Sequence, residues 1–410
     1  MVNAIFLEIR GIIMKVFIND YMVIVNNKFE KRIFVYDRLN RVEYEINDDC
    51  FDVILDIKNN DYTLEYLYTM YDKDFIDQLF ELGILTNNIQ KNINNVKKLD
   101  TYNNVRIFVE LTNKCNLKCK HCYGGFACTN NTNLNIDAIK QMIDNASKNG
   151  VYQFDITGGE PTLYPYLEEI MEYVYNAGML MRIFTNLTTY SEKFKSLILK
   201  YGVKDIVTSI DSCIREVHEE FRGQKGCFDK TLNAIKKLQK ENISISLNTM
   251  IGNHNKKHIK ELVNFINNLK VKSVLDVIVP EGRATDLNED IKESGQVIKS
   301  IYEMNSSKID KEAISISCGV GNRFIYVKSD GNIYLCPSLI KEEYKLGNIN
   351  TFDTVEIWKL MSDNFLNLGC SKKTEKCKNC TGGCRARALS LHNDINSQDD
   401  VYCIINGVEK

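Results

Sequence analysis

Six short apolar segments between residues 105 and 279 alternate with longer amphipathic segments, and this alternation limits the possible folds more than any other feature. The apolar segments have the length of strands: Val105–Leu111, Gln153–Thr157, Leu180–Thr185, Asp205–Ile210, Ile243–Thr249 and Ser273–Val279. Helices are expected to begin between them, near Asp137, Tyr164, Ser191, Asp229 and Asn255. Repeated strand–helix units favour a parallel sheet. We therefore predict an α/β fold, a partial parallel (βα)6 barrel with its chemistry in loops at the carboxyl ends of the strands.

Residues 1–95 are predicted to form a separate small α+β domain. Alternating apolar residues favour short strands, which are expected at Lys15–Ile18, Tyr21–Val25, Arg32–Tyr36 and Val42–Ile46. Three short helices are expected to follow, and their capping residues would be Asp49, Thr63 and Asp72. This combination is similar to a winged helix. The polar stretch 87–104 is predicted to be a linker.

The charge of the chain limits what this small domain can bind. Its 52 basic and 54 acidic residues give a net charge of −2, which lacks the electrostatic footprint of general nucleic-acid binding. Modules of this kind also hold peptides, by adding them as a strand to an exposed sheet edge. We therefore expect no nucleic-acid partner, and peptide binding stays open as the function of residues 1–95.

The chain contains 14 cysteines. Its first residues include Glu8 and Arg10 within an apolar run and lack a basic leader, so they match a signal peptide poorly. No apolar run reaches the roughly 18 residues of a transmembrane helix. A cytoplasmic protein without a membrane partner is expected, and there many cysteines indicate metal or redox chemistry rather than disulfides. No role is assigned to four isolated cysteines: Cys50, Cys128, Cys213 and Cys227.

Three cysteines follow the first predicted barrel strand, in the sequence Cys115-Asn-Leu-Lys-Cys119-Lys-His-Cys122. Three thiolates on one short loop can bind three irons of a cubic iron–sulfur cluster and leave the fourth iron open to another ligand. A zinc site with His121 as the fourth ligand is the alternative, although structural zinc sites are commonly built from paired C-x2-C elements. His121 also lies between two thiolates, where simultaneous ligation is difficult. The sequence therefore favours an iron–sulfur cluster.

This C-x3-C-x2-C loop resembles that of the radical S-adenosylmethionine (radical SAM) superfamily. The segment Thr157-Gly158-Gly159-Glu160-Pro161 closes the second predicted strand, as the GGE motif of that family does. Further matching segments follow in order at strand ends and in loops: Thr185-Asn186, Ser209-Ile210-Asp211, Arg222-Gly223 and Pro280-Glu281-Gly282-Arg283-Ala284.

The resemblance implies a 4Fe–4S cluster on the three loop cysteines, with S-adenosylmethionine bound at its open iron. Reductive cleavage would generate a 5′-deoxyadenosyl radical that abstracts hydrogen from the substrate. Gly158 and Gly159 would let the backbone approach the cofactor, and Glu160 would pair with its ammonium group. Contacts to its ribose, methionine carboxylate or adenine are expected from His121, Asn186, Ser209 and Arg222. For Asn186 and Arg222, a strand-end cap or turn explains the residue equally well.

Seven further cysteines lie in the last quarter of the chain, which is predicted to be a cysteine-rich, iron–sulfur-binding extension. They are Cys318, Cys336, Cys370, Cys377, Cys380, Cys384 and Cys403. Their order resembles the SPASM domain appended to radical SAM peptide maturases. The central block runs C-x6-C-x2-C-x3-C here, whereas in that family it usually runs C-x2-C-x5-C-x3-C.

Carried over by order, this resemblance implies two auxiliary 4Fe–4S clusters. One would be bound by Cys318, Cys336 and Cys384, and the other by Cys370, Cys377, Cys380 and Cys403. A zinc ribbon stays open as an alternative, because Cys377-Lys-Asn-Cys380 alone is an ordinary zinc half-site. A zinc pair at His254 and His258 is also conceivable, but a polar helix start explains these two residues better.

Three regions are thus expected: a peptide-recognition domain at 1–95, a radical SAM barrel at 104–305 and a SPASM extension at 306–410. Together they predict an oxygen-sensitive radical SAM enzyme that modifies a ribosomally made precursor peptide, forming a thioether or carbon–carbon cross-link. Its partners would be that peptide and an electron donor such as flavodoxin or ferredoxin. The alternatives are modification of a haem or tetrapyrrole precursor, which Cys384-Arg-Ala-Arg-Ala suggests, maturation of a sulfatase, or a zinc-bearing, non-catalytic peptide-binding module.

Overall fold

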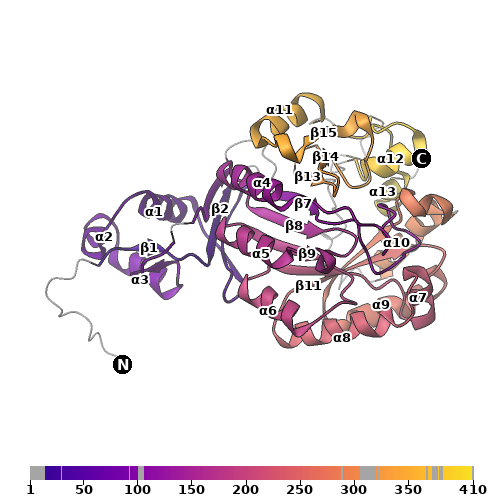
Figure 1. Ribbon diagram of the computed structural model, residues 1–410, viewed down its shortest axis with the longest axis horizontal. Coiled ribbons are helices and arrows are strands. Elements are labelled where there is room, and N and C mark those ends of the chain that lie inside the picture. The colour runs from indigo at the N-terminus through magenta and orange to yellow at the C-terminus, as the bar shows by residue number, and fades with distance from the viewer. Residues whose placement is uncertain are drawn as a thin grey trace. The chain divides into compact units, whose positions relative to one another are not determined.

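Two compact units make up the chain (Figure 1). The first consists of Met1–Thr101 with Asn176–Gly178, and the second of Tyr102–Tyr175 with Met179–Lys410. The computed structural model of the 410-residue chain describes the following residues: 14–28, 30–91, 93–99, 106–287, 290–304, 320–321, 323–365, 368–371, 377 and 382–408.

In its described residues, the first unit combines two small sheets with three helices. A four-stranded sheet has the order β4-β3-β2-β6, and a second sheet pairs β1 with β5. The bounds are β1 Phe17–Ile18, β2 Met22–Asn27, β3 Arg32–Asp37, β4 Val42–Glu45, α1 Asp48–Asn59, α2 Leu64–Met70, α3 Lys73–Glu81, β5 Leu85–Thr86 and β6 Val96–Leu99. The helices bury one apolar face each, with Phe51, Leu67 and Ile76 fully enclosed in a common core. The unit therefore has a hydrophobic core of its own.

Local capping signals locate the helices of this unit well. Thr63 and Asp72 cap α2 and α3 as predicted, because their side chains accept hydrogen bonds from backbone N–H groups three residues later. The prediction for α1 was wrong by two residues, since Asn47 rather than Asp49 is its cap. The predicted linker 87–104 was also wrong in part. It contains β6, which pairs in parallel with β2, a contact that no local pattern encodes.

The second unit is built on a nine-stranded sheet with the order β12-β11-β10-β9-β8-β7-β13-β14-β15. All six predicted barrel strands are present and parallel, which confirms the predicted partial barrel. They are β7 Arg106–Glu110, β8 Gln153–Thr157, β9 Leu180–Phe184, β10 Asp205–Thr208, β11 Ile245–Ile251 and β12 Lys272–Val277. Side chains on both faces of β10 are buried, as expected for a strand in a covered parallel sheet.

Helices connect successive barrel strands, and Figure 1 shows α4, α5 and α6 running alongside β7, β8 and β9. Their bounds are α4 Ile136–Lys148, α5 Leu167–Asn176, α6 Glu192–Lys200, α7 Arg215–Arg222, α8 Cys227–Lys240, α9 Ile259–Leu269 and α10 Ile291–Met304. Ser191 caps α6, as the sequence predicts. The connection after β10 contains two helices rather than one, which brings Arg222 at the end of α7 back to the strand ends.

The C-terminal extension continues the barrel sheet instead of forming a separate layer. Its first strand, β13 Phe324–Val327, pairs in parallel with β7, and two antiparallel strands follow, β14 Asn332–Tyr334 and β15 Lys345–Asn348. The described residues of the extension also form the α-helices α11 Thr354–Phe365, α12 Arg385–His392 and α13 Asp400–Ile405. Val401 of α13 packs with Ile291 and Ile298 of α10, so the extension and the barrel share a core.

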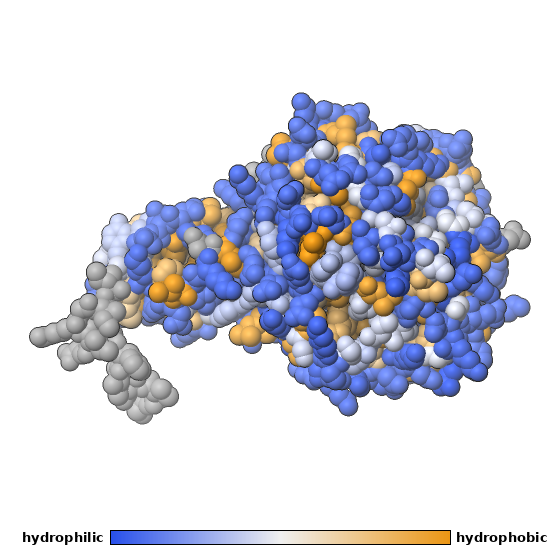
Figure 2. Space-filling model, in the orientation of Figure 1, coloured by the Kyte–Doolittle hydropathy of each residue, from blue (hydrophilic) through white to orange (hydrophobic). Residues whose placement is uncertain are grey.

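None of the helices in the described part of the chain is long and apolar enough to cross a membrane. The face of the molecule visible in Figure 2 carries mostly hydrophilic residues, with hydrophobic residues in small groups.

Candidate functional site

A cavity lies at the carboxyl ends of the parallel strands, where the loop after β7 meets the ends of β8 to β11. The three predicted core-cluster ligands, Cys115, Cys119 and Cys122, all line it. So do most of the residues predicted to contact the cofactor, namely His121, Gly158, Gly159, Asn186, Ser209 and Arg222. Glu160 is the one predicted contact that lies outside the lining. The structure thus assembles segments more than 100 residues apart into one site.

The cluster loop, defined as residues 112–126, is held in shape by Arg283. The Arg283 guanidinium donates hydrogen bonds to the carbonyl oxygens of Cys119, at 2.8 Å, and Phe126, at 3.0 Å. Its backbone N–H donates to the Cys122 carbonyl at 3.0 Å. Arg283 lies in one of the segments that match the family, but no role for it is predicted from the sequence. Its function as a brace could not be seen because the loop that it holds lies about 160 residues earlier in the chain.

Two glycines allow other loops to touch the backbone of the cluster loop. A Cβ added to Gly159 would lie 2.3 Å from the Lys114 carbonyl oxygen, and one added to Gly282 would lie 2.2 Å from the Tyr123 carbonyl oxygen. Gly282 also has a φ of +58°, which side chains other than glycine rarely adopt. Any larger residue at either position would displace the backbone that carries the cysteines.

Replacing Arg283 with methionine is expected to loosen this loop while keeping most of the side-chain volume. Two hydrogen bonds from a charged donor, worth about 1.5–3 kcal/mol each, would be lost. We expect the core cluster to be released to an iron chelator at least roughly tenfold faster, measured anaerobically by absorbance. Arg215→Met, at an exposed position on α7, is the matched control. Equal release rates for the wild type and Arg283→Met would show that Arg283 does not hold the loop.

Glu160 lies just behind the cavity wall and is completely buried. Its carboxylate accepts hydrogen bonds from the hydroxyls of Thr162, at 2.7 Å, and Thr185, at 2.8 Å, and from the backbone N–H of Asn186 at 2.9 Å. Burial raises the pKa of Glu160, and these hydrogen bonds oppose that rise. The contacts support a positioning role, in which Glu160 fixes the 185–186 segment, whereas its pairing with a ligand ammonium group stays a prediction.

Asn186 combines the two interpretations that the sequence left open. Its side chain accepts a hydrogen bond from the Thr188 backbone N–H at 2.8 Å, as a turn residue would. The same side chain donates to Asn116 in the cluster loop at 2.9 Å and lines the cavity. Asn186 therefore ties the end of β9 to the cluster loop.

Arg222 lines the cavity as a charged group held by a buried partner. Its Nε donates to the carboxylate of Asp211 at 2.5 Å, and its Nη1 lies 3.9 Å from the Cys119 sulfur. Burial by itself raises the pKa of Asp211, but the positive charge of Arg222 outweighs it and holds the pKa of that carboxyl below its usual range. The pair is therefore ionised. Asp211 directly follows Ser209-Ile210 in a segment that matches the family, yet its partner could not be deduced without the fold.

The His121 ring of the cluster loop belongs to a stack of three flat rings. The His121 and Phe221 ring centroids are 4.6 Å apart with an interplanar angle of 8°, and those of Phe221 and His254 are 3.6 Å apart at 7°. Burial lowers the pKa of His121 to about 3 and that of His254 to about 4, so both imidazoles are neutral at pH 7. His258 instead contacts Ser212, with its Nε2 at 2.8 Å from the hydroxyl. The conceivable zinc pair of His254 and His258 thus gains no support.

The thiols and polar groups that line this cavity fit a 4Fe–4S cluster and S-adenosylmethionine, the two groups that the resemblance implies. Within the described residues, no three Cys, His, Asp or Glu side chains are arranged to hold one metal ion. A cubic cluster makes a different demand, because each thiolate binds its own iron. The loop cysteines pack together with Leu117 and Phe126, which gives soft sulfur ligands in an apolar wall. The buried Nδ1 of His121 has no partner within the described part of the chain, so a hydrogen-bonding group for a ligand is available there.

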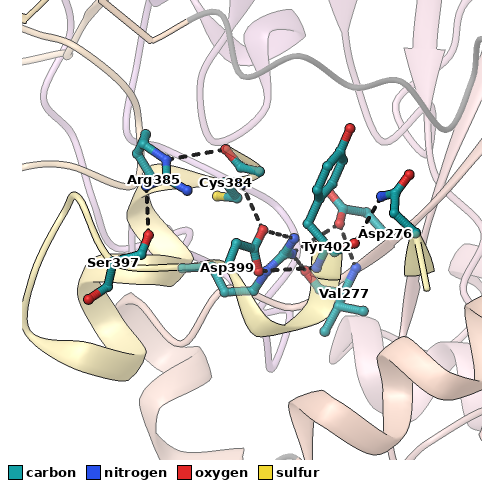
Figure 3. Close-up of polar contacts among 10 residues, drawn as sticks. Asp276, Val277, Cys384, Arg385, Ser397, Asp399 and Tyr402 are labelled. Carbon is teal, nitrogen blue, oxygen red and sulfur yellow. Dashed lines mark hydrogen bonds and ion pairs between the residues drawn. The ribbon is translucent and has the colours of Figure 1, made fainter. Parts of the chain in front are cut away.

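The predicted auxiliary ligands are only partly visible. Cys318 and Cys380 lie outside the described residues. Cys384 and Cys403 are joined through Asp399, whose carboxylate accepts the Cys384 backbone N–H at 2.7 Å and whose carbonyl oxygen accepts that of Cys403 at 3.0 Å. Figure 3 shows Cys384 beside Asp399 in this network. The assignment of the cysteines to two separate clusters stays a prediction.

Comparisons with known proteins agree with this geometry. Residues 109–266 match the model of the radical SAM superfamily, and residues 318–381 match that of the SPASM iron–sulfur cluster-binding domain. The chain is 29% identical over 302 residues to the antilisterial bacteriocin subtilosin biosynthesis protein AlbA of Bacillus subtilis, covering 68% of this chain and 67% of AlbA. It is also 29% identical over 337 residues to the AdoMet-dependent heme synthase of Methanosarcina barkeri, covering 72% and 95%.

Solved structures share the fold at lower sequence identity. SuiB of Streptococcus suis bound to the precursor peptide SuiA superposes with a TM-score of 0.63 and 16% identity, covering 95% of this chain and 99% of SuiB. The enzyme anSMEcpe with bound AdoMet gives a TM-score of 0.60 and 19% identity over 74% of this chain and 94% of that chain. The cysteine loop lies in the cavity at the strand ends, inside the segment that matches the radical SAM model, so we conclude that the chain contains a radical SAM domain followed by a SPASM domain and is a radical SAM enzyme.

Proposed function

We propose that this enzyme modifies a ribosomally synthesised precursor peptide. The observation that carries the proposal is the combination of a separate N-terminal unit with a radical SAM barrel and a SPASM extension. Peptide-maturing relatives support it, including AlbA and the mycofactocin maturase MftC of Mycobacterium tuberculosis. Its radical SAM domain, which identifies the chain as an enzyme, argues against the alternative of a non-catalytic, zinc-bearing peptide-binding module.

Different residues of the cavity are proposed to bind the iron–sulfur cluster and S-adenosylmethionine. Cys115, Cys119 and Cys122 would hold the core 4Fe–4S cluster, which with S-adenosylmethionine would supply the radical for hydrogen abstraction. The backbone at Gly158 and Gly159 gives the cofactor close access to the strand ends. Polar contacts to the cofactor are proposed for His121, Asn186, Ser209 and Arg222. The Asp211–Arg222 ion pair fixes the arginine before any ligand arrives, so no side-chain ordering has to accompany binding.

The product is proposed to be a thioether or carbon–carbon cross-link. Forming such a bond after hydrogen abstraction leaves one electron and one proton to be removed, and an auxiliary cluster would accept the electron. The auxiliary ligands would be Cys318, Cys336 and Cys384 for one cluster and Cys370, Cys377, Cys380 and Cys403 for the other. A flavodoxin or ferredoxin would supply the electron that starts each turnover.

Coexpression with a short peptide encoded beside this protein, followed by mass spectrometry of the peptide, tests the proposal. A loss of two hydrogen atoms per linkage is expected, and fragment ions should locate the link. An unchanged peptide mass in the presence of active enzyme, shown by 5′-deoxyadenosine formation, would count against peptide cross-linking.

The N-terminal unit offers an edge for the peptide at β4. This strand ends the four-stranded sheet of the described residues, and its first residue, Val42, is exposed, as is Leu39 just before it. The Ile46 N–H donates to the Ile33 carbonyl of β3, and the alternation of an antiparallel pair then directs the backbone N–H of Glu45 away from β3. An extended leader segment could pair with this free edge.

Replacing Glu45 with proline is expected to raise the KM for the full precursor about tenfold, since one or two backbone hydrogen bonds would be lost. The kcat is expected to stay unchanged, because the cavity is untouched. Glu45→Ala, which keeps the N–H, is the matched control and should behave as the wild type. The measurement is initial-rate kinetics with the full precursor, and an unchanged KM for Glu45→Pro would exclude this edge as the docking site.

A second function is favoured by one observation. AdoMet-dependent heme synthases match this chain over most of their length, and Cys384-Arg-Ala-Arg-Ala is similar to the end of the related domain in enzymes that modify haem precursors. Anaerobic incubation with a haem precursor distinguishes the two functions, since only a tetrapyrrole-modifying enzyme would change the porphyrin spectrum. Sulfatase maturation is tested in the same way with a peptide that carries the target cysteine or serine.

A further inference from the structure

Two buried arginines lie two residues apart at the start of α12, and their surroundings differ. Arg387 is fully engaged, because its Nε and Nη2 each donate to the carboxylate of Asp399 at 2.8 Å. Its Nη1 donates to Asp276 at 3.2 Å and to the carbonyl oxygen of Val277 at 3.3 Å, both at the end of β12. Figure 3 labels the partners of Arg387, namely Asp399, Asp276 and Val277, and these contacts tie α12 and the start of α13 to the end of β12. The role of Arg387 is thereby explained by the fold.

Arg385 is only 1% exposed. Unlike Arg387, it contacts carbonyl oxygens and no carboxylate among the described residues. Its Nη1 donates to the carbonyl oxygens of Ile395 and Ser397, at 2.8 Å each, and its Nε lies 3.4 Å from the Gly383 carbonyl oxygen. Nη2 is buried and has no hydrogen-bond partner in the described part of the chain. None of the described carboxylates forms an ion pair with it. Burying a guanidinium N–H without a hydrogen-bond acceptor costs free energy of folding, so a bound group that accepts from Nη2 would explain its position.

The unpartnered Nη2 lies against the segments that carry predicted iron ligands. A Cβ added to Gly382 would lie 3.4 Å from Nη2 and 3.1 Å from the backbone nitrogen of Cys370. The chain then runs through Gly383 to Cys384, one residue before Arg385 itself. Arg385 Nη1 binds the carbonyl oxygens of residues 395 and 397, and the residue between them also contacts the Cys370 segment. The Ser371 N–H donates to the Asn396 carbonyl oxygen at 2.7 Å. Nη2 is thus placed where the Cys370 and Cys384 segments meet.

We propose that Arg385 donates a hydrogen bond through Nη2 to a sulfur atom of the auxiliary iron–sulfur cluster bound by Cys370. The inference rests on the auxiliary clusters of the proposed function. A donor and a positive charge beside a cluster sulfur stabilise the reduced, more negative cluster and raise its reduction potential. Arg385 would therefore make this cluster a better acceptor for the electron that remains after hydrogen abstraction and bond formation.

The test uses the full chain with Cys115, Cys119 and Cys122 replaced by alanine, so that only auxiliary clusters contribute to the spectra. The midpoint potential is measured by an anaerobic redox titration followed by electron paramagnetic resonance. With Arg385→Met, the ratio of reduced to oxidised cluster at a fixed potential should fall roughly tenfold, which for one electron is about 59 mV. One of the two auxiliary signals should shift and the other should not. Arg215→Met, at an exposed position, is the control for loss of an arginine.

Arg385→Lys keeps the charge but loses the planar fork, so a smaller shift in the same direction is expected. If Arg385→Met fails to retain its auxiliary iron, the lysine variant decides: a lowered potential supports the inference, and an unchanged one overturns it. An unchanged potential in Arg385→Met with full iron content also overturns it. If the background variant binds no auxiliary iron at all, the proposed clusters are wrong and the inference falls with them, an outcome distinct from a failure of Arg385 alone.

Discussion

Replacing Cys115, Cys119 and Cys122 together with alanine is expected to abolish reductive cleavage of S-adenosylmethionine while leaving the protein folded. Each of the three thiols lines the same cavity, and without them the core cluster has no ligands. The iron content should fall by about four per chain. The measurements are iron analysis after anaerobic reconstitution and the dithionite-dependent formation of 5′-deoxyadenosine.

The fold is expected to survive this change because hydrogen bonds to the backbone of the cluster loop, and not the cysteine thiols, hold the loop in shape. Arg283 holds two of its carbonyl oxygens, and Glu160 donates its backbone N–H to the Lys114 carbonyl at 2.9 Å. The circular dichroism spectrum should therefore match that of the wild type without iron. Cys128→Ala is the control, since Cys128 is exposed close to the same loop. Deoxyadenosine formation by the triple variant at the wild-type rate would show that the radical is generated elsewhere.

Replacing Arg387 with alanine is expected to destabilise the second unit by about 3–5 kcal/mol, because it removes one partner of a buried ion pair. Asp399 is 1% exposed and would keep its charge without compensation. The Asp399 carboxylate also accepts the backbone N–H groups of Cys384 and Tyr402. The loss should therefore loosen the segments on both sides of α12. The effect is measured as a lower midpoint in anaerobic denaturant unfolding of the protein without iron.

A surface ion pair in the same region is the matched control. Lys292 of α10 lies 3.0 Å from the carboxylate of Asp400 in α13, and its side chain is 63% exposed. Lys292→Ala should cost less than about 1 kcal/mol, since water already solvates most of the lysine. Similar unfolding midpoints for the Arg387→Ala and Lys292→Ala variants would mean that the buried pair does not fasten the extension to the barrel.

Local sequence signals were sufficient for the six barrel strands and for most of the helices, but not for β6 or α7. The six apolar segments are the six parallel strands of the barrel, and capping residues such as Thr63 and Ser191 mark helix starts. These elements can be predicted from the sequence because a helix cap involves residues only three positions apart and a buried strand requires only a short run of apolar side chains. The cysteine spacing and the GGE segment indicated the radical SAM domain for a similar reason, since the residues of each motif lie close together in the chain.

Contacts between distant residues were decided only by the tertiary structure. The pairing of β13 with β7 makes the extension part of the barrel sheet, although more than 200 residues separate Arg106 from its partner Phe324. The sequence predicts that Glu160 pairs with a cofactor ammonium group, whereas the structure shows that it binds Thr185 and Asn186. These two donors directly follow the next strand, β9, so the contact could not be seen in the sequence.

The sequence by itself therefore determined the likeness to radical SAM and SPASM domains and the places of the barrel strands along the chain, and it predicted the three cysteine ligands of the core cluster. Only the fold decided which groups hold that loop and which charges are paired, as with Arg283 on the Cys119 carbonyl and Arg387 on Asp399. The physical reason is that hydrogen bonds and ion pairs act over a few ångströms in space. Residues separated by many positions carry no local pattern that shows which of them will meet.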